Sequence, residues 1–386
     1  MKPAKKGRED GAALLMIVIV TMVLLIIGTT MLMVNSSDSA AINPGGERPV
    51  TGEVPPPPID PDLYYDPDFG WMTDTGEAYF DNNLNNVFDE GDTYVDVTRN
   101  LVTSERLIIP PSVGEIDLGN RSRTFIAAEG IYLGTSVTSH QGNSSLTLLS
   151  DSGLIKIANS EGANSVLTHF EITISNANGD IKVDEGVTLT STQSGSKGNI
   201  ILSAGGSVDI GGAILDAGVG IVINAGEEVM MTGSNLTAGG GIGVVSDQEI
   251  EMSGSTVRAG GLIYIESASS GDLTGAELET IGGIEIETGE EIVMAGMNLR
   301  AAGWTDIRSG TDIDIRNAEL RSSGTITLTA GNNTTPGTIS VNRAAAGEPG
   351  TRILSTAGQA KQAIAKPLAV TIDGTPERGS IVRAPL

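Results

Sequence analysis

One apolar pattern recurs every 21 residues between Val208 and Leu328, and this period restricts the chain to very few architectures. Each unit has two pairs of large apolar residues, the members of a pair two positions apart, with one more apolar residue between the pairs. A spacing of two places both side chains on one face of a β-strand. Within these columns only Gly271 and Thr305 are not large and apolar. The first column consists of Val208, Val229, Ile250, Gly271, Ile292 and Ile313.

Three short strands per unit, separated by glycine-containing turns, predict a mainly β chain that folds as a parallel β-helix with about 21 residues per coil, which we expect to be right-handed. We place the β-helix at residues 131–355, with Val187/Leu189 and Ile200/Leu202 in the same register. Stacked coils expose unpaired backbone at both ends, so residues 101–130 and 356–386 are the expected N-terminal cap and C-terminal cap or tail.

Glycine recurs four residues after the start of each unit. The column is Gly212, Gly233, Gly254, Gly275 and Gly296, and Asn317 continues it. Both residue types tolerate positive φ, so this column predicts a stacked turn in the left-handed conformation.

The composition agrees with this fold and restricts the classes of partner that the chain can bind. There are 51 glycines but only 3% aromatic residues, which favours short strands and turns over a ring-filled globular core. The 48 acidic and 23 basic residues give a net charge of −25, which argues against a nucleic-acid partner. Cysteine is absent. The repeat unit resembles haemagglutinin-like and other bacterial surface β-helix repeats in architecture.

Residues 12–34 form an uncharged apolar run that is long enough to cross a bilayer as a single helix. Cations in the leader, residues 1–11, precede it, so we expect a cytoplasmic N-terminus and an exported remainder, periplasmic or extracellular. A cleaved secretory signal is the alternative, although its apolar region would be shorter.

The junction Lys5-Lys6-Gly7-Arg8-Glu9-Asp10-Gly11, followed at once by Ala12-Ala13-Leu14-Leu15, resembles the N-terminus of the type IV pilin superfamily, in particular the PilX-type minor pilins and pseudopilins. The resemblance implies that a prepilin peptidase cuts between Gly11 and Ala12, and that the apolar helix packs among pilus or secretion-filament subunits. Met16 stands where that family usually has glutamate. A generic signal anchor remains the other interpretation.

A proline-rich linker, residues 35–61, leads to an acidic tandem repeat in residues 62–100. In the second unit, oxygen-bearing side chains stand at positions 1, 3, 5, 9 and 12, the spacing of a calcium-binding loop, with a backbone carbonyl expected at position 7. The predicted Ca²⁺ ligands are Asp81, Asn83, Asn85, Val87, Asp89 and Asp92, with Asp66, Asp68, Asp74 and Glu77 of the first unit as second choice. The second unit resembles the calcium-binding repeats of secreted bacterial proteins. Asn86 replaces their glycine at position 6, and a solvated acidic linker is the alternative.

Outward-facing charged residues of the predicted β-helix, called the rod below, form two columns. One contains Asp209, Glu251, Asp272 and Asp314, and the other contains Arg258, Glu279, Arg300 and Arg321. We interpret both as solvated faces and predict no catalytic residues. The preferred function is therefore a non-enzymatic, membrane-anchored, pilin-like surface protein whose acidic β-helix serves adhesion or filament assembly. The alternative is a surface-tethered protein that binds a polysaccharide ligand, or a lyase or hydrolase of the β-helix type.

Overall fold

The computed structural model describes residues 63–139, 144–159, 165–168, 171–191, 198–331, 337–342, 351–355, 360–362, 369–372 and 381–383. The chain divides into two compact units, Met1–Pro57 and Pro58–Leu386, and every described residue belongs to the second. The Gly11–Ala12 junction, the apolar run 12–34 and the linker 35–61 lie outside the described residues. Within the described ranges, no helix is long and apolar enough to span a membrane.

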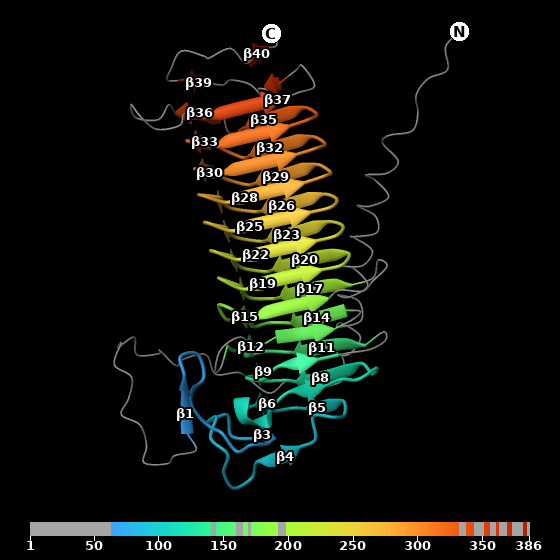
Figure 1. Ribbon diagram of the computed structural model, residues 1–386. Coiled ribbons are helices and arrows are strands. Elements are labelled where there is room, and N and C mark those ends of the chain that lie inside the picture. Colours follow the sequence, from blue (N-terminus) through green and yellow to red (C-terminus); the bar gives the residue numbers. More distant parts are fainter. Residues whose placement is uncertain are drawn as a thin grey trace, which may run out of the picture. The chain divides into compact units, whose positions relative to one another are not determined.

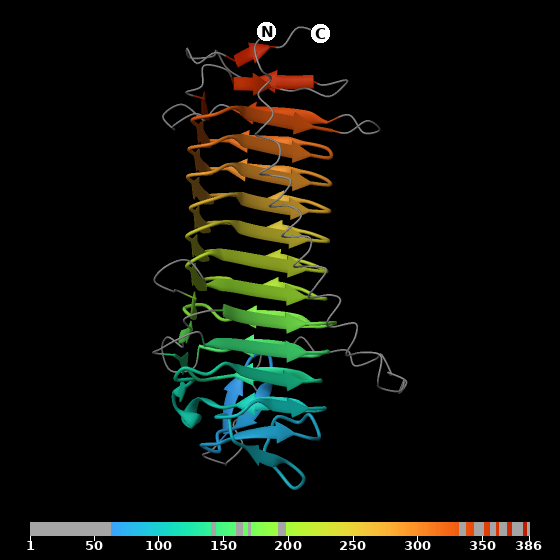
Figure 2. The same ribbon diagram turned by 90° about the vertical axis from the view of Figure 1, so that its right-hand side faces the viewer.

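Three parallel β-sheets run the length of the second unit, and the chain visits them in turn as it winds (Figures 1 and 2). The first sheet contains the parallel strands β6 (Arg106–Ile109), β9 (Gly130–Leu133), β12 (Leu154–Ile157), β15 (Asp180–Val183), β18 (Val208–Asp209), β21 (Val229–Met230), β24 (Ile250–Glu251), β27 (Gly271–Asp272), β30 (Ile292–Ala295), β33 (Ile313–Arg316), β36 (Thr338–Asn342) and β39 (Ala369–Ile372).

The second sheet contains β7 (Ile116–Asp117), β10 (Val137–Thr138), β13 (Ser165–Thr168), β16 (Thr188–Ser191), β19 (Ile214–Ala217), β22 (Asn235–Ala238), β25 (Thr256–Ala259), β28 (Glu277–Thr280), β31 (Asn298–Ala301), β34 (Glu319–Ser322) and β37 (Arg352–Ser355). The third contains β5 (Leu101–Thr103), β8 (Arg123–Ala127), β11 (Ser145–Ser150), β14 (Glu171–Asn176), β17 (Asn199–Ala204), β20 (Gly220–Ala225), β23 (Ile242–Ser246), β26 (Ile263–Ser267), β29 (Ile284–Thr288), β32 (Thr305–Ser309) and β35 (Ile326–Ala330).

The strand register confirms the parallel β-helix and its 21-residue coil. Val208 pairs with Val229, Val229 with Ile250, and the same step continues to Ile313. Alternate side chains of all three sheets point inward into one continuous core, in which Ile221, Leu236 and Ile250 are fully buried. At about 4.8 Å per coil, the eleven stacked strands of the second or third sheet span roughly 50 Å.

The predicted turn column is also confirmed. Gly212, Gly233, Gly254, Gly275 and Gly296 have φ of 69°, 70°, 67°, 69° and 67°, and Asn317 takes their place with φ 52°. Asparagine fits here because its short polar side chain tolerates the left-handed region.

A second stacked column, which the apolar pattern does not predict, consists of small polar residues. Ser246, Ser267, Thr288 and Ser309 end successive strands of the third sheet and point inward, each at most 3% exposed. Each hydroxyl donates to backbone carbonyls of the adjoining turns, as Ser309 Oγ does to Asp312 O at 2.9 Å. These bonds satisfy turn carbonyls that would otherwise be buried without partners.

The coils upstream of Val208 are longer, and one register prediction there is wrong. Ile200 pairs with Ile221 as expected, but Leu189 pairs with Leu215 in the second sheet, and Ile181 is the residue that pairs with Val208. Eight positions separate the end of β16 from the start of β17, whereas three separate β19 from β20. The longer connection shifts everything before it out of the 21-residue step.

The N-terminal end of the stack is closed by antiparallel strands. β3 (Ala78–Asp81) pairs antiparallel with β6 on one side and with β4 (Thr93–Val95) on the other, so β6 has no open edge. Two further strands, β1 (Leu63–Asp66) and β2 (Gly70–Thr73), form an antiparallel hairpin. A short 3-10 helix, Pro111–Val113, links the first and second sheets. At the far end, β38 (Ala360–Gln362) pairs with β40 (Ile381–Arg383).

Candidate functional site at the capped end

The hairpin β1–β2 packs on the outer face of the first sheet, where it builds a small second core. One outward column of that sheet runs Tyr79, Ile108, Tyr132 and Lys156 on successive strands. The first three are at most 1% exposed, because Met72 of β2 and the rings of Tyr64 and Phe69 cover them. Outward positions of a solenoid normally face water, so this burial shows that the hairpin is an integral part of the fold.

Lys156 fastens the hairpin to the rod. Its side chain is 1% exposed, and Nζ lies 2.7 Å from Asp66 Oδ2 and 2.6 Å from Asp68 Oδ2, with Asp184 Oδ1 at 3.5 Å. Lys182, one coil further, lies 2.8 Å from the same Asp68 carboxylate. Asp66 also caps the hairpin turn, since its Oδ1 accepts the backbone N–H groups of Asp68 and Phe69. A buried ammonium is tolerated only with such partners.

The pKa shifts in this cluster follow from burial and charge. Burial disfavours the Lys156 ammonium, but hydrogen bonds to Asp66 and Asp68 outweigh it and raise the lysine's pKa. Burial acts against the Asp68 carboxylate too, and the bonds from Lys156 and Lys182 overcome it, so its pKa is lowered. For Asp184, burial dominates over the more distant Lys156 and raises the pKa.

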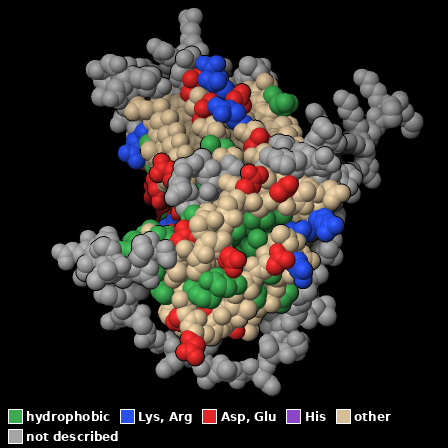
Figure 3. Space-filling model, turned by 60° about the horizontal axis from the view of Figure 1, so that its bottom comes forward, with side chains coloured by type: hydrophobic (Ala, Val, Ile, Leu, Met, Phe, Trp, Pro, Cys, Tyr) green, Lys and Arg blue, Asp and Glu red, His purple; other side chains and the backbone are tan. Residues whose placement is uncertain are grey.

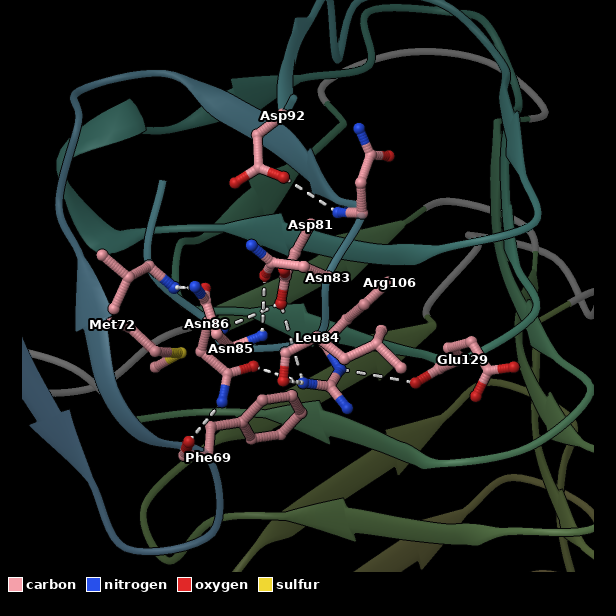
Figure 4. A network of polar contacts seen from close by, with 12 residues as sticks. Phe69, Met72, Asp81, Asn83, Leu84, Asn85, Asn86, Asp92, Arg106 and Glu129 are labelled. Atoms are coloured by element: carbon pink, nitrogen blue, oxygen red, sulfur yellow. Dashed lines mark hydrogen bonds and ion pairs between the residues drawn. The ribbon is translucent and has the colours of Figure 1, made fainter. Parts of the chain in front are cut away.

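The six residues of the favoured calcium prediction are Asp81, the last residue of β3, and five residues of the loop between β3 and β4. Figure 4 shows polar contacts around Asp81. Asp81 is fully buried. Its Oδ2 accepts the backbone N–H of Asn86 at 2.9 Å and lies 3.7 Å from Arg106 Nη1, while its Oδ1 has no partner among the described residues. Burial lowers the pKa of the Arg106 guanidinium below its usual value, with Asp81 opposing.

Three other predicted ligands meet directly. Asn83 Nδ2 lies 3.0 and 2.9 Å from the two oxygens of Asp89, and Asn85 Nδ2 lies 2.8 Å from Asp89 Oδ2. The amide oxygens of Asn83 and Asn85 accept the backbone N–H groups two residues on. Asn86 follows with φ 67°, as predicted for the position that replaces glycine.

The remaining predicted ligands are placed differently. Asp92 lies away from Asp81 and Asn83, where its carboxylate accepts the backbone N–H groups of Asn82 and Asp89 at 2.9 and 3.1 Å (Figure 4). Val87 contributes its backbone N–H to Asn85 Oδ1 at 2.7 Å. Within the described ranges, no three His, Cys, Asp or Glu side chains converge as a metal-binding group, so a cation here would depend on the asparagine oxygens.

The second-choice ligands do not gather around one centre. Asp66 and Asp68 bond to lysines of the rod, as described above, whereas Asp74 accepts a hydrogen bond from Ser112 in the 3-10 helix. The backbone N–H of Glu77 donates to Thr75 Oγ1, and the Thr75 hydroxyl donates to the Glu77 carbonyl. Sequence spacing could not distinguish a metal-ligand ladder from carboxylates that face lysines in distant coils.

The structure aligns both predicted charge columns along the regular coils, residues 198–331. Asp209, Met230, Glu251, Asp272, Val293 and Asp314 stand in one register line of the first sheet, and Arg258, Glu279, Arg300 and Arg321 in one line of the second. The charged side chains in both lines are partly or fully exposed, unlike Lys156, and only Asp314 Oδ1 among their atoms is buried without a partner in the described residues.

Seen from the end that carries β3 and β4, hydrophobic and acidic side chains share the surface (Figure 3). The exposed hydrophobic residues in this part of the chain include Leu84, Tyr94 and Val102, with Val102 71% exposed.

No protein-family model, curated protein or solved structure matches this chain.

Proposed function

We propose that this chain is a non-enzymatic, membrane-anchored surface protein that presents an acidic β-helix for adhesion or filament assembly. The observation that carries the proposal is the buried contact of Lys156 with Asp66 and Asp68. The hairpin that bears the two aspartates begins directly after the proline-rich linker. In a rod attached to an anchor, load on the linker would pass through this hairpin, which the buried Lys156 contacts hold on the first sheet.

The anchor itself is proposed from sequence. Residues 12–34 are the transmembrane or filament-packing helix, with the N-terminus in the cytoplasm and the rod on the far side of the inner membrane. By its resemblance to PilX-type minor pilins and pseudopilins, the chain would be cut by a prepilin peptidase between Gly11 and Ala12.

Fractionation of expressing cells tests this proposal. We expect the protein in the inner membrane or in sheared filament fractions, with the rod accessible to protease added from outside the cytoplasm. N-terminal sequencing of the exported protein then separates the two anchors, since Ala12 at the terminus indicates peptidase processing and Met1 indicates a signal anchor. A soluble cytoplasmic protein would overturn the proposal.

Calcium binding by the loop 81–92 is proposed as a stabiliser of the capped end. The buried Asp81 Oδ1 without a partner supports it, because a buried carboxylate oxygen is costly unless bonded. To bind the ion, the Asn83 and Asn85 amides would turn their oxygens toward Asp89 and give up the backbone N–H groups of Asn85 and Val87. Asp81, Asn83, Asn85 and Asp89 would hold the ion, and Arg106 competes with it for Asp81.

Calorimetry with the full chain tests the calcium proposal. We expect heat of binding at micromolar to millimolar Ca²⁺ and a melting temperature that rises with Ca²⁺ concentration. Asp81→Asn and Asp89→Asn should abolish both effects, whereas Glu90→Gln, an exposed carboxylate in the same loop, should leave them intact. Absence of heat at millimolar Ca²⁺, or an equal loss with Glu90→Gln, would reject the site.

A further inference from the structure

The regular coils carry a groove that the proposed anchor and cap do not use. It has a volume of about 690 Å³, within the range of ligand sites. It follows the outward column of the second sheet, whose successive residues in register are Thr237, Arg258, Glu279, Arg300, Arg321 and Leu354. Six rungs at about 4.8 Å give it a length of roughly 24 Å parallel to the axis of the stack.

Small residues in the turns that follow the strands of the second sheet leave space for the groove. Gly260, Ile281, Ala302 and Ser323 occupy equivalent turn positions in four successive coils and line it; three are small, and Ile281 is 75% exposed. Two residues beyond Ala302 stands Trp304, whose ring packs over Gly283 of the previous coil and remains 41% exposed. The groove therefore combines an apolar floor and an exposed aromatic neighbour with a charged wall.

That wall concentrates the positive charge of the regular coils. Residues 198–331 contain five basic residues, all arginine, against nineteen acidic ones, and Arg258, Arg300 and Arg321 all line this groove. Arg258 is paired with Glu277 and Glu279, and Arg321 with Glu319, all at the surface. Arg300 makes no ion pair with any residue that the structure describes, so its guanidinium is available to a ligand.

We infer that this groove binds an unbranched, carboxylate-bearing polysaccharide that lies parallel to the axis of the stack. Guanidinium groups bind carboxylates through paired hydrogen bonds, and arginines repeated along one line match a polymer with repeated acidic groups. Sugar rings supply apolar faces for Ile281 and the turn residues. Nucleic acid fits less well, because its denser phosphates would face Glu277, Glu279 and Glu319 as well as the arginines.

The inference deepens the proposed adhesive function and rests on it for its biological role, but binding itself can be measured separately. The full-length protein in a neutral detergent is applied to immobilised polygalacturonate, with dextran as the uncharged control. A chelator in the buffer removes calcium bridges between the acidic protein and the polymer. We expect saturable binding to polygalacturonate that weakens with salt, and none to dextran.

The variants locate the binding. Arg300→Gln should weaken affinity by about tenfold, the loss expected for one charged hydrogen-bonding group. Arg308→Gln and Arg316→Gln are matched controls, because they remove surface arginines from the third and first sheets, and they should leave affinity unchanged. Glu279→Gln removes the carboxylate between Arg258 and Arg300 and should strengthen binding severalfold, a gain that misfolding cannot produce.

Equal losses in Arg300→Gln and Arg308→Gln, equal binding to dextran, or tighter binding to single-stranded DNA than to polygalacturonate would overturn the inference. A cytoplasmic location in the fractionation experiment would overturn the proposed function while leaving this binding result in place. Conversely, a surface-exposed protein that does not bind polygalacturonate would contradict the inference about the groove and leave the proposed function intact.

Discussion

The outward face of the first sheet differs sharply between the first coils and the regular coils. In the first coils it carries Tyr132 and Lys156, which the hairpin β1–β2 covers. In the regular coils the same register line carries Asp209, Glu251 and Asp272, which face solvent. The backbone is alike in both regions, so the difference comes from what covers the outward side chains.

The two regions are therefore stabilised in different ways. A regular coil contacts only the coils above and below it, and its stability is nearly a sum of neighbour terms. The capped end depends on contacts between residues 90 positions apart, such as Lys156 with Asp66. Damage to the cap should be felt across the whole N-terminal end, whereas damage to a regular coil should stay near its site.

The largest expected effect is at the cap. Lys156→Met leaves the Asp66 carboxylate buried without its cation, and breaking such a pair costs about 3–5 kcal/mol. We expect chemical denaturation to show a destabilised N-terminal end and protease to cleave near residues 63–73. The control Lys182→Met removes a partly exposed lysine with one partner, and its cost should stay below about 1 kcal/mol. Equal effects of the two variants would mean that the hairpin is not held by the buried lysine.

Removal of a core side chain tests the regular coils. Leu236 is fully buried, and Leu236→Ala should lower the free energy of unfolding by about 2–5 kcal/mol. Thr237→Ala, an outward neighbour on the same strand, should change it by less than about 0.5 kcal/mol. Hydrogen exchange should show the loss in β22 and adjacent coils only. A loss of protection that spread as far as the hairpin would contradict local, additive stability.

Backbone conformation at the turns gives a smaller effect. Gly254 has φ 67° and open space around it, so Gly254→Ala costs only the backbone strain of about 1–2 kcal/mol. Gly243 also has open space but does not have a positive φ, so Gly243→Ala should be neutral or slightly stabilising. Thermal unfolding of both variants measures the difference, and similar melting temperatures would show that the turn column is not conformationally required.

The smallest effect expected is on pH dependence. Asp68 has a lowered pKa, so its stabilisation of the hairpin is present above the unfolded value of about 4 and is lost as pH falls through the lower folded pKa. Lys156 has a raised pKa, so its share is present below about 10 and is lost as pH rises through the higher folded pKa. Asp184, with a raised pKa, acts in the opposite sense to Asp68 and reduces the loss in acid.

Protease protection of the hairpin, measured from pH 3 to pH 11, checks this. We expect a plateau between about pH 4 and about pH 10 and a decline on either side. In Lys156→Met the alkaline decline should become smaller, and the remainder should come from the buried Tyr64, Tyr79 and Tyr132, whose raised pKa values also cost stability above about pH 10. A decline centred near neutral pH would show that other groups control the hairpin.

Much of the fold could be predicted from the sequence, because the contacts between neighbouring coils repeat. The inward columns such as Val208 and Val229, and the left-handed turn at Gly254 and Asn317, repeat because each coil meets an almost identical neighbour. The candidate site was harder to predict. Asp66 and Asp68 read as calcium ligands because their spacing fits a loop, and the lysine that binds them stands in another coil. The signal that could have found it was Lys156 and Lys182 side by side on an otherwise acidic chain.

The sequence by itself determined the repeat: the 21-residue period, the inward and outward faces, and the positions of the charge columns all follow from alternation and short turns. Only the tertiary structure decided the capped end. There the hairpin returns onto coils far away in the sequence, Lys156 replaces solvent as the partner of two aspartates, and Leu189 takes the place in register that a longer connection assigns it. Periodicity predicts contacts between equivalent positions, whereas a contact that occurs once leaves no periodic trace.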